Sequence, residues 1–284
     1  MADQVIEDIN NGTLTAENLS HETLRKNYKR QIYEDGRDVL GRGRGVLDDT
    51  DHLDQYLHSY GRMANQQWEG PLDITMIEGE TTVIDYGCGQ GLSFLNAICR
   101  WQLEDDEKTW QDYIKSIVLI EPSQIALNRA EAIAKLKFPD ANIYTITKKL
   151  EELGNEDLAF DANKIMIHIF SQVLDIPLAD GFDLLDFFET ITSTVGAHYI
   201  HVVSHEVDSI NSQRNILKLY KYIVSKYVHA EVSGDTIHAV LKTPPKEPLK
   251  IIKKATSMAL NTFKIEGTAR SYDTIAIFAC IKTY

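Results

Sequence analysis

Cysteine is scarce in this chain, and so are the features that mark membrane and secreted proteins. The 284 residues include three cysteines, and these stand at neither metal-ligand nor disulfide-framework spacings. No apolar run approaches the roughly 20 residues of a membrane helix, and the first eight residues lack the basic-then-apolar order of a secretory signal. We therefore expect a cytoplasmic protein without metal, disulfide or membrane contact. The cysteines are Cys88, Cys99 and Cys280.

Positive charge is also in deficit. Lysine and arginine number 29 against 42 aspartates and glutamates, which gives a formal net charge of −13. Broad binding to nucleic acid depends on neutralising many phosphates, so we do not expect extended nucleic-acid binding. The hydrophobic fraction of 43% and the charged fraction of 25% are ordinary for a soluble globular protein.

The segment 83–91, VIDYGCGQG, carries the main functional signal. A β-branched run at 81–84 predicts a buried strand, which ends at Asp85, and a helix is expected from Leu92. A strand that leads through a glycine-rich turn into a helix brings a nucleotide-like ligand against bare backbone, because glycine has no Cβ. The glycines of this turn are Gly87, Gly89 and Gly91.

Two other phosphate-binding loops fit this segment less well. A Walker loop is excluded, because no lysine follows Gly91. The dinucleotide fingerprint requires a third glycine where this chain has Leu92, which leaves an NAD-dependent oxidoreductase as a weaker alternative. A glycine turn that binds no ligand is the remaining interpretation.

The pattern of two apolar residues, Asp, and then glycine at alternate positions resembles motif I of the class I S-adenosylmethionine-dependent methyltransferases. The resemblance implies that the turn lies under the amino acid part of the ligand, and that the acid holds the turn and the ligand's ammonium. It therefore assigns S-adenosyl-L-methionine as cofactor, bound by Asp85, Gly87, Cys88, Gly89 and Gly91.

A second strand, expected near 117–121, supports the resemblance. It ends at Glu121 and Pro122, where this family carries an acid that accepts hydrogen bonds from two ribose hydroxyls. The third strand end carries Lys148, Lys149 and Leu150 where the family contacts adenine, usually beside an acid. Leu150 is the residue expected to contact the adenine. At the fourth strand end, Ser171 and Gln172 are expected to line the donor pocket.

From residue 81 the pattern alternates strand and helix, which predicts an α/β fold. We expect a Rossmann-like, seven-stranded, mostly parallel sheet with helices on both faces, preceded by an N-terminal helical extension. The expected domains are a helical cap at 1–78 and a methyltransferase-like domain at 79–284. Within the cap we expect a mobile loop at 36–45 and one helix at 48–63, with Tyr60 near the cleft. After the parallel strands we expect a hairpin at 228–241, a short helix around 249–260 and a final strand at 274–281.

The methyl acceptor is not specified by the sequence. The Asn/Asp-Pro-Pro-Tyr/Phe motif of amino-methylating enzymes and the Pro-Cys motif of 5-methylcytosine enzymes are both absent. A small molecule or a protein is favoured over nucleic acid as acceptor. If the acceptor must lose a proton, His205 and Glu206 are the best-placed bases, since they follow the fifth strand. A methyltransferase fold that has lost catalysis and serves in binding or assembly is the main alternative. The oligomeric state is left open.

Overall fold

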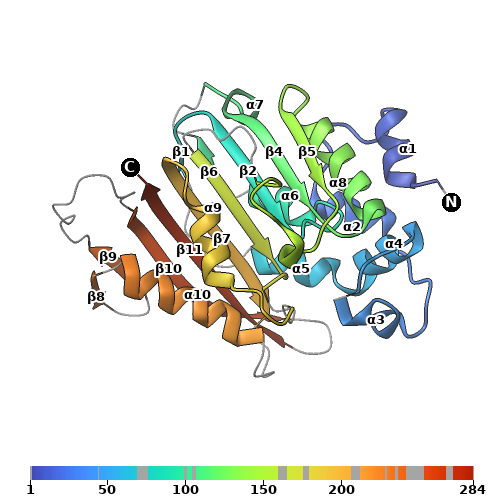
Figure 1. The fold of residues 1–284 in the computed structure, drawn as a ribbon. Coiled ribbons are helices and arrows are strands. Elements are labelled where there is room, and N and C mark those ends of the chain that lie inside the picture. Colours follow the sequence, from blue (N-terminus) through green and yellow to red (C-terminus); the bar gives the residue numbers. More distant parts are fainter. Residues whose placement is uncertain are drawn as a thin grey trace.

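The computed structural model of the protein is an α/β fold built on one large mixed sheet (Figure 1). The structure describes residues 2–43, 45–68, 76–98, 101–103, 107–158, 165–174, 179–205, 212–227, 229–233, 236–240, 253–266 and 271–283. Within these ranges, no helix combines the length and the apolar character needed to cross a bilayer.

The large sheet has the strand order β10-β11-β7-β6-β2-β4-β5. Its first five strands along the chain run parallel, and β11 is antiparallel to β7 and to β10. The α/β class and the mostly parallel sheet are thus confirmed. The strands are β2 (Thr81–Tyr86), β4 (Ile114–Ile120), β5 (Asn142–Ile146), β6 (Ile165–Ser171), β7 (Gly196–His205), β10 (Lys253–Glu266) and β11 (Ser271–Thr283).

Two short pairs of strands lie outside this sheet. The first pair is parallel and consists of β1 (Met76–Ile77) and β3 (Gln102–Leu103). The second is the hairpin of β8 (His229–Ser233) and β9 (Thr236–Val240), close to the expected bounds.

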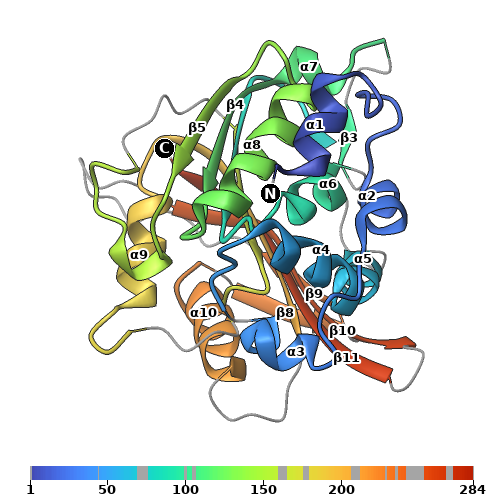
Figure 2. The same ribbon diagram turned by 90° about the vertical axis from the view of Figure 1, so that its right-hand side faces the viewer.

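Helices cover both faces of the sheet, and the sequence pattern of β2 explains why. All six residues of β2 are buried, and alternate side chains enter opposite cores, as a strand's period of two requires. Val83 packs in a core with α5 (Gly61–Trp68), α6 (Leu92–Ile98) and α8 (Gln124–Lys137). Ile84 packs in a core with α9 (Leu184–Ile191) and α10 (Ser212–Tyr227). Figure 2 shows the sheet between these two groups of helices.

The N-terminal residues form helices that pack against α6 and α8 (Figure 2). Leu24 and Leu57 share a buried cluster with Leu92 and Leu95 of α6. The remaining helices are α1 (Gln4–Asn10), α2 (His21–Tyr28), α3 (Gly36–Val39), η1 (Gly41–Gly43), α4 (Thr50–Ser59), α7 (Trp110–Tyr113) and η2 (Leu150–Glu152).

Two expectations for the N-terminal residues are wrong. The segment expected as a mobile loop forms α3 and η1, since backbone N–H groups of Leu40 and Gly43 find carbonyl partners one turn earlier. The single helix expected at 48–63 is two helices, because α4 ends at Ser59, with Tyr60 as its C-cap, and α5 starts at Gly61.

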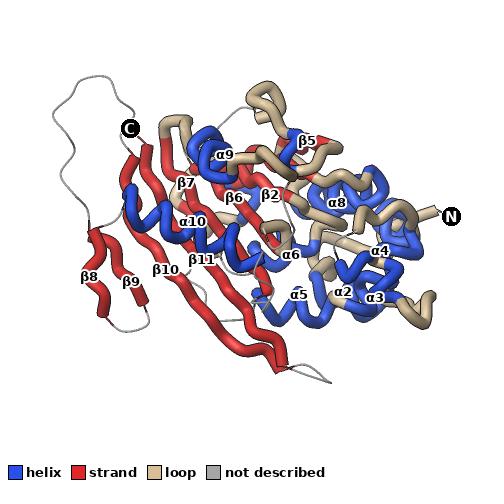
Figure 3. Tube along the Cα trace, turned by 60° about the horizontal axis from the view of Figure 1, so that its bottom comes forward, coloured by secondary structure: helices blue, strands red, loops and turns tan. Residues whose placement is uncertain are grey.

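The helix expected around 249–260 is also wrong. Residues from Lys253 onward form β10, which pairs with β11 along its length (Figure 3). Strand β11 has one edge on β7, and β10 pairs with its other edge and satisfies the backbone hydrogen bonds there. The β-prone residues Thr262, Phe263 and Ile265 suit that position.

Candidate functional site

The carboxyl ends of the parallel strands meet at a cavity of about 310 Å³. This volume lies at the lower end of the range for small-molecule sites, roughly 300–1,000 Å³. Segments that follow β2, β4, β5 and β6 form its floor, and residues from α4, α5 and the preceding loop form its roof. The predicted site residues on its wall are Gly87, Cys88, Gly89, Glu121, Pro122, Leu150, Ser171 and Gln172.

The glycine turn exposes bare backbone to this cavity at Gly89. All three glycines have positive φ, between +52° and +86°, which L-residues with side chains rarely adopt. A Cβ added at Gly91 would meet the backbone of Ala130 at 3.2 Å, and one at Gly87 would meet Val173 at 3.0 Å. A Cβ added at Gly89 would meet nothing within 4 Å. Gly91 is therefore required for helix packing, whereas the space beside Gly89 is open.

Glu121 is tied to this turn. Its Oε2 accepts a hydrogen bond from the backbone N–H of Gly89 at 3.1 Å, and its Oε1 accepts one from Ser123 at 3.0 Å. Burial raises the pKa of the Glu121 carboxyl, and the two backbone N–H donors oppose that shift. Each carboxylate oxygen keeps acceptor capacity beyond these single bonds. The acid is thus fixed in orientation and lies on the cavity wall.

Asp85 lies beneath the turn and does not line the cavity. Its side chain is fully buried, and Oδ2 accepts a hydrogen bond from Ser93 Oγ at 2.6 Å. Its Oδ1 has no hydrogen-bond partner among the described residues. Burial raises the pKa of Asp85 to about 7, and the nearby Glu121 charge adds to the rise. Asp85 therefore supports the start of α6, and its predicted contact with a ligand stays a prediction.

The end of β6 is held by the N-terminal helix α5. Trp68 Nε1 donates to Ser171 Oγ at 3.3 Å, and Gln172 Nε2 donates to Gln67 Oε1 at 2.7 Å. Gln67 is fully buried. Gln172 also has a φ of +60°, which a non-glycine residue seldom adopts. These contacts join segments more than 100 residues apart in the chain.

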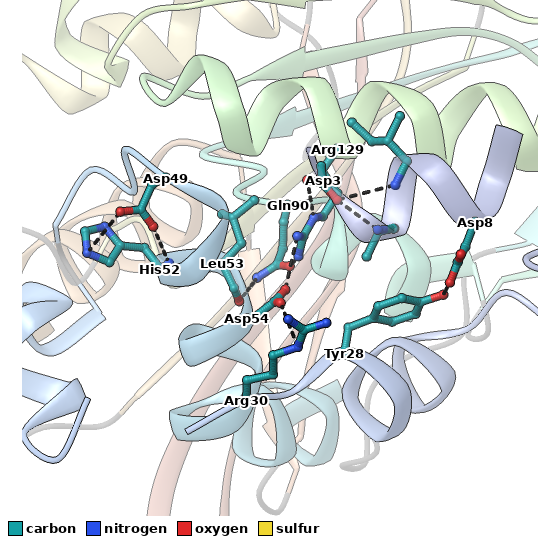
Figure 4. A network of polar contacts seen from close by, with 12 residues as sticks. Asp3, Asp8, Tyr28, Arg30, Asp49, His52, Leu53, Asp54, Gln90 and Arg129 are labelled. Carbon is teal, nitrogen blue, oxygen red and sulfur yellow. Dashed lines mark hydrogen bonds and ion pairs between the residues drawn. The ribbon is translucent and has the colours of Figure 1, made fainter. Parts of the chain in front are cut away.

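A buried ionic network attaches the N-terminal residues to the glycine turn (Figure 4). Arg129 of α8 is 1% exposed and binds Asp3 at 2.8 Å and Asp54 at 3.1 Å. Its third partner is Gln90, which stands between Gly89 and Gly91, at 2.8 Å. Gln90 Nε2 in turn donates to the carbonyl of Leu53 in α4. The roof of the cavity and the turn in its floor therefore share one set of polar contacts.

Two lysines stand where the family usually carries an acid near the adenine. Lys148 and Lys149 both line the cavity. Lys148 Nζ binds both carboxylate oxygens of Asp157 at 2.7 Å, so its charge is compensated within the protein. Leu150 remains the apolar surface at this end of the site.

His168 of β6 belongs to a buried chain of hydrogen bonds, which lies on the opposite side of the sheet from α5. Tyr86 Oη lies 3.1 Å from His168 Nδ1, and His168 Nε2 lies 3.1 Å from His198 Nδ1. His198 Nε2 lies 2.9 Å from the carbonyl of Thr194, which can only accept, so each ring donates from Nε2 and accepts at Nδ1. Burial lowers the pKa of His168 well below its usual value. His168 is therefore a neutral structural residue.

The two predicted catalytic residues are not tested by the structure. His205 ends β7, but its side chain lies outside what the structure describes, and Glu206 lies outside the described residues. Both stay predictions.

The roof of the cavity comes from the N-terminal helices expected over the cleft, but the sequence pattern indicated Tyr60 and not the residues that form the roof. Tyr56, Ala64 and Trp68 line the cavity, whereas Tyr60 packs beside Tyr56 with ring centroids 5.1 Å apart. The aromatic residues that recur along 53–63 predict a buried helix face, but they do not indicate which of them lines the cavity. Gln90 and Asn96 were also missed, since nothing in the sequence distinguishes them from surface amides.

No protein-family model and no curated protein matches the sequence. Several solved structures are similar in fold. A SAM-dependent methyltransferase from Leishmania major matches with 12% identity and a TM-score of 0.40, over 91% of each chain. An rRNA methylase from Streptococcus thermophilus matches with 12% identity and a TM-score of 0.35, over 78% of this chain and 95% of that one. A geranyl diphosphate methyltransferase matches with 11% identity and a TM-score of 0.38, over 92% of this chain and 98% of that one. At these scores the function must be argued from the residues of the site.

Proposed function

We propose that the protein is an S-adenosylmethionine-dependent methyltransferase. The observation that carries the proposal is the hydrogen bond between Glu121 and the backbone of Gly89 on the wall of one cavity. It places a fixed carboxylate beside a bare, open stretch of backbone. A nucleoside with a charged amino acid arm needs these two surfaces side by side. The strand order, with antiparallel β11 between β7 and β10, agrees with the seven-stranded sheet of that family.

The donor fits the cavity residue by residue. The turn at Gly87 and Gly89 supports its amino acid part, with Asp85 acting from beneath through the turn. Glu121 and Pro122 hold the ribose, and Leu150 contacts the adenine. When bound, S-adenosylmethionine supplies an electrophilic methyl group on a sulfonium. The remaining proposed contacts of the donor are Cys88, Gly91, Ser171 and Gln172.

The protein's own contribution to the reaction is alignment and exclusion of water. The roof residues Tyr56, Ala64 and Trp68 give the cavity an apolar cover. We assign this roof to a cap at 1–78 over a catalytic domain at 79–284. A concave, partly open cavity of this size favours a small-molecule acceptor over a polymer. His205 and Glu206 remain the proposed bases for an acceptor that must be deprotonated.

Calorimetric titration with S-adenosylhomocysteine tests the proposal. The wild-type protein should bind it, and Glu121→Gln should weaken binding at least about tenfold, because a carboxylate accepts hydrogen bonds more strongly than an amide oxygen. Glu131→Gln, on the exposed side of α8, is the matched control and should leave the affinity unchanged. Absence of binding by the wild-type protein at millimolar ligand would refute the proposal. Binding without transfer to any acceptor would favour the assembly-module alternative.

A further inference from the structure

One residue of the cavity wall holds an uncommon backbone conformation. Gln172 is the only non-glycine with positive φ among the described residues, at +60°. This conformation costs on the order of 1–2 kcal/mol for an L-residue. The strain is maintained by neighbouring contacts, since the backbone N–H of Gln172 donates to the carbonyl of Val203 at 2.9 Å. Strain that is held in place on the wall of a cavity points to a role for the side chain it orients.

The side-chain amide of Gln172 is oriented as well. Its Nε2 donates to Gln67 Oε1 at 2.7 Å, and the fully buried Gln67 has little freedom to move. Its Oε1 accepts no hydrogen bond from any described residue, while the residue itself lines the cavity. The amide therefore offers the cavity an acceptor oxygen, which is the negative end of its dipole.

Among the described residues of the wall, no histidine, carboxylate or thiol is placed to deprotonate an acceptor near Gln172. Within the described part of the wall there is no histidine. Its carboxylates, Glu121 and Glu151, follow β4 and β5, and β2 separates those strands from β6. Burial raises the pKa of the Cys88 thiol, which keeps it protonated. A hydroxyl acceptor needs a base during transfer, whereas a neutral amine attacks with its own lone pair.

We propose that Gln172, positioned by Gln67, binds the acceptor, and that the acceptor is a small amine. This inference rests on the proposed methyltransferase function. The Oε1 of Gln172 accepts a hydrogen bond from the amine N–H and stabilises the positive charge that develops on nitrogen. A nitrogen–carbon bond forms as the carbon–sulfur bond breaks, the sulfonium becomes a neutral thioether, and the nitrogen afterwards releases one proton to water.

Sinefungin provides a test that needs no knowledge of the natural acceptor. It is an analogue of the donor in which an amine stands where the sulfonium carries its methyl group. In the wild-type protein it should bind at least about tenfold more tightly than S-adenosylhomocysteine, because its ammonium donates to Gln172 Oε1. In Gln172→Gly this preference should fall to about twofold or less, because the affinity for sinefungin falls further than the affinity for S-adenosylhomocysteine. Glycine accepts the backbone conformation, so this variant keeps the fold.

Two further measurements complete the design. Gln111→Ala is the control and should keep the full preference for sinefungin. The Gln111 side chain donates to the carbonyl of Lys137 and lies away from the cavity. Two adenosine derivatives with an amino group at the 5′ position test the acceptor class. They differ only in the arm on that 5′ nitrogen, which is aminoethyl in one and hydroxyethyl in the other. The aminoethyl compound should bind more tightly to the wild-type protein, and Gln172→Gly should abolish the difference.

The outcomes separate this inference from the proposed function. If neither S-adenosylhomocysteine nor sinefungin binds, the methyltransferase proposal fails and this inference with it. If both bind equally well to the wild-type protein, or if Gln172→Gly keeps the preference for sinefungin, only the role of Gln172 is overturned. A hydroxyethyl arm that binds as tightly as the aminoethyl arm would overturn the assignment of an amine acceptor.

Discussion

Arg129 Nη1 donates to Gln90 Oε1 at 2.8 Å, so a helix of the core reaches directly into the glycine turn. The same guanidinium binds Asp3 and Asp54 from the N-terminal residues. Fixed geometry and several donors make arginine suited to such a junction. The roof and the floor of the cavity are therefore held in register through one side chain (Figure 4).

Arg129→Met should destabilise the protein by about 3–5 kcal/mol, because it removes the cation that binds the buried carboxylate of Asp3 and leaves Asp54 only its longer contact with Arg30. The free energy of unfolding from urea titration measures the effect. Lys135→Met is the matched control on the same helix, since its ion pair with Glu131 is exposed, and it should cost less than about 1 kcal/mol. A loss of less than 1 kcal/mol for Arg129→Met would show that the network does not hold the N-terminal residues in place.

Gly89→Ala should lower the affinity for S-adenosylhomocysteine at least tenfold at a small cost in stability. Its Cβ projects into open space on the cavity wall, where the ligand's place is proposed. Gly12→Ala controls for the backbone effect, because Gly12 also has positive φ, at +78°, and open surroundings, but lies outside the cavity. Both variants should lose about 1–2 kcal/mol of stability. Equal ligand affinities in the two variants would contradict the assignment of Gly89.

Asp85→Asn should stabilise the protein more at pH 8 than at pH 5.5. The folded state raises the pKa of Asp85 from 3.8 to about 7, so between these values it holds a proton that the unfolded chain has released. The contribution of Asp85 to stability therefore falls as pH rises through this window, by about 1.4 kcal/mol per unit. Asparagine does not titrate. The free energy of unfolding of the variant, relative to that of the wild type, should therefore grow by about 2 kcal/mol from pH 5.5 to 7.

Urea unfolding of both proteins at pH 5.5, 7 and 8 provides the measurement. Asp140→Asn, at an exposed position just beyond α8, is the matched control for the substitution of an aspartate by asparagine. A pH-independent effect of Asp85→Asn would mean that the Asp85 carboxyl is not held in a desolvated environment.

Local chemistry accounts for most of what the sequence predicted correctly. The turn at Gly87 and Gly89 and the N-cap of α8 at Ser123 depend on residues next to one another in the chain. The ends of the parallel strands follow from their apolar runs, and these ends place Glu121 and Gln172 on one cavity.

The remainder of the site depends on contacts between distant segments. The contacts of Gln67 and Trp68 with the end of β6 follow from how α5 packs, and no local pattern encodes that packing. Residues 253–266 carry an ambiguous pattern of mixed lysine and apolar residues, and pairing with β11 decides that they form a strand. The positive φ of Gln172 was also invisible in the sequence, since glutamine seldom adopts it.

The buried network around Arg129 has a consequence for synthesis of the chain. Asp3 and Asp54 leave the ribosome well before Arg129, and at roughly 5–20 residues per second the delay is on the order of seconds. During that interval Asp3 lacks Arg129 and Asp54 has only Arg30, and the apolar side chains around them lack the surface of α8. The segment that contains Asp3 and Asp54 is therefore made before α8 but settles only after it, and the cavity gains its roof only after the core that it covers has been translated.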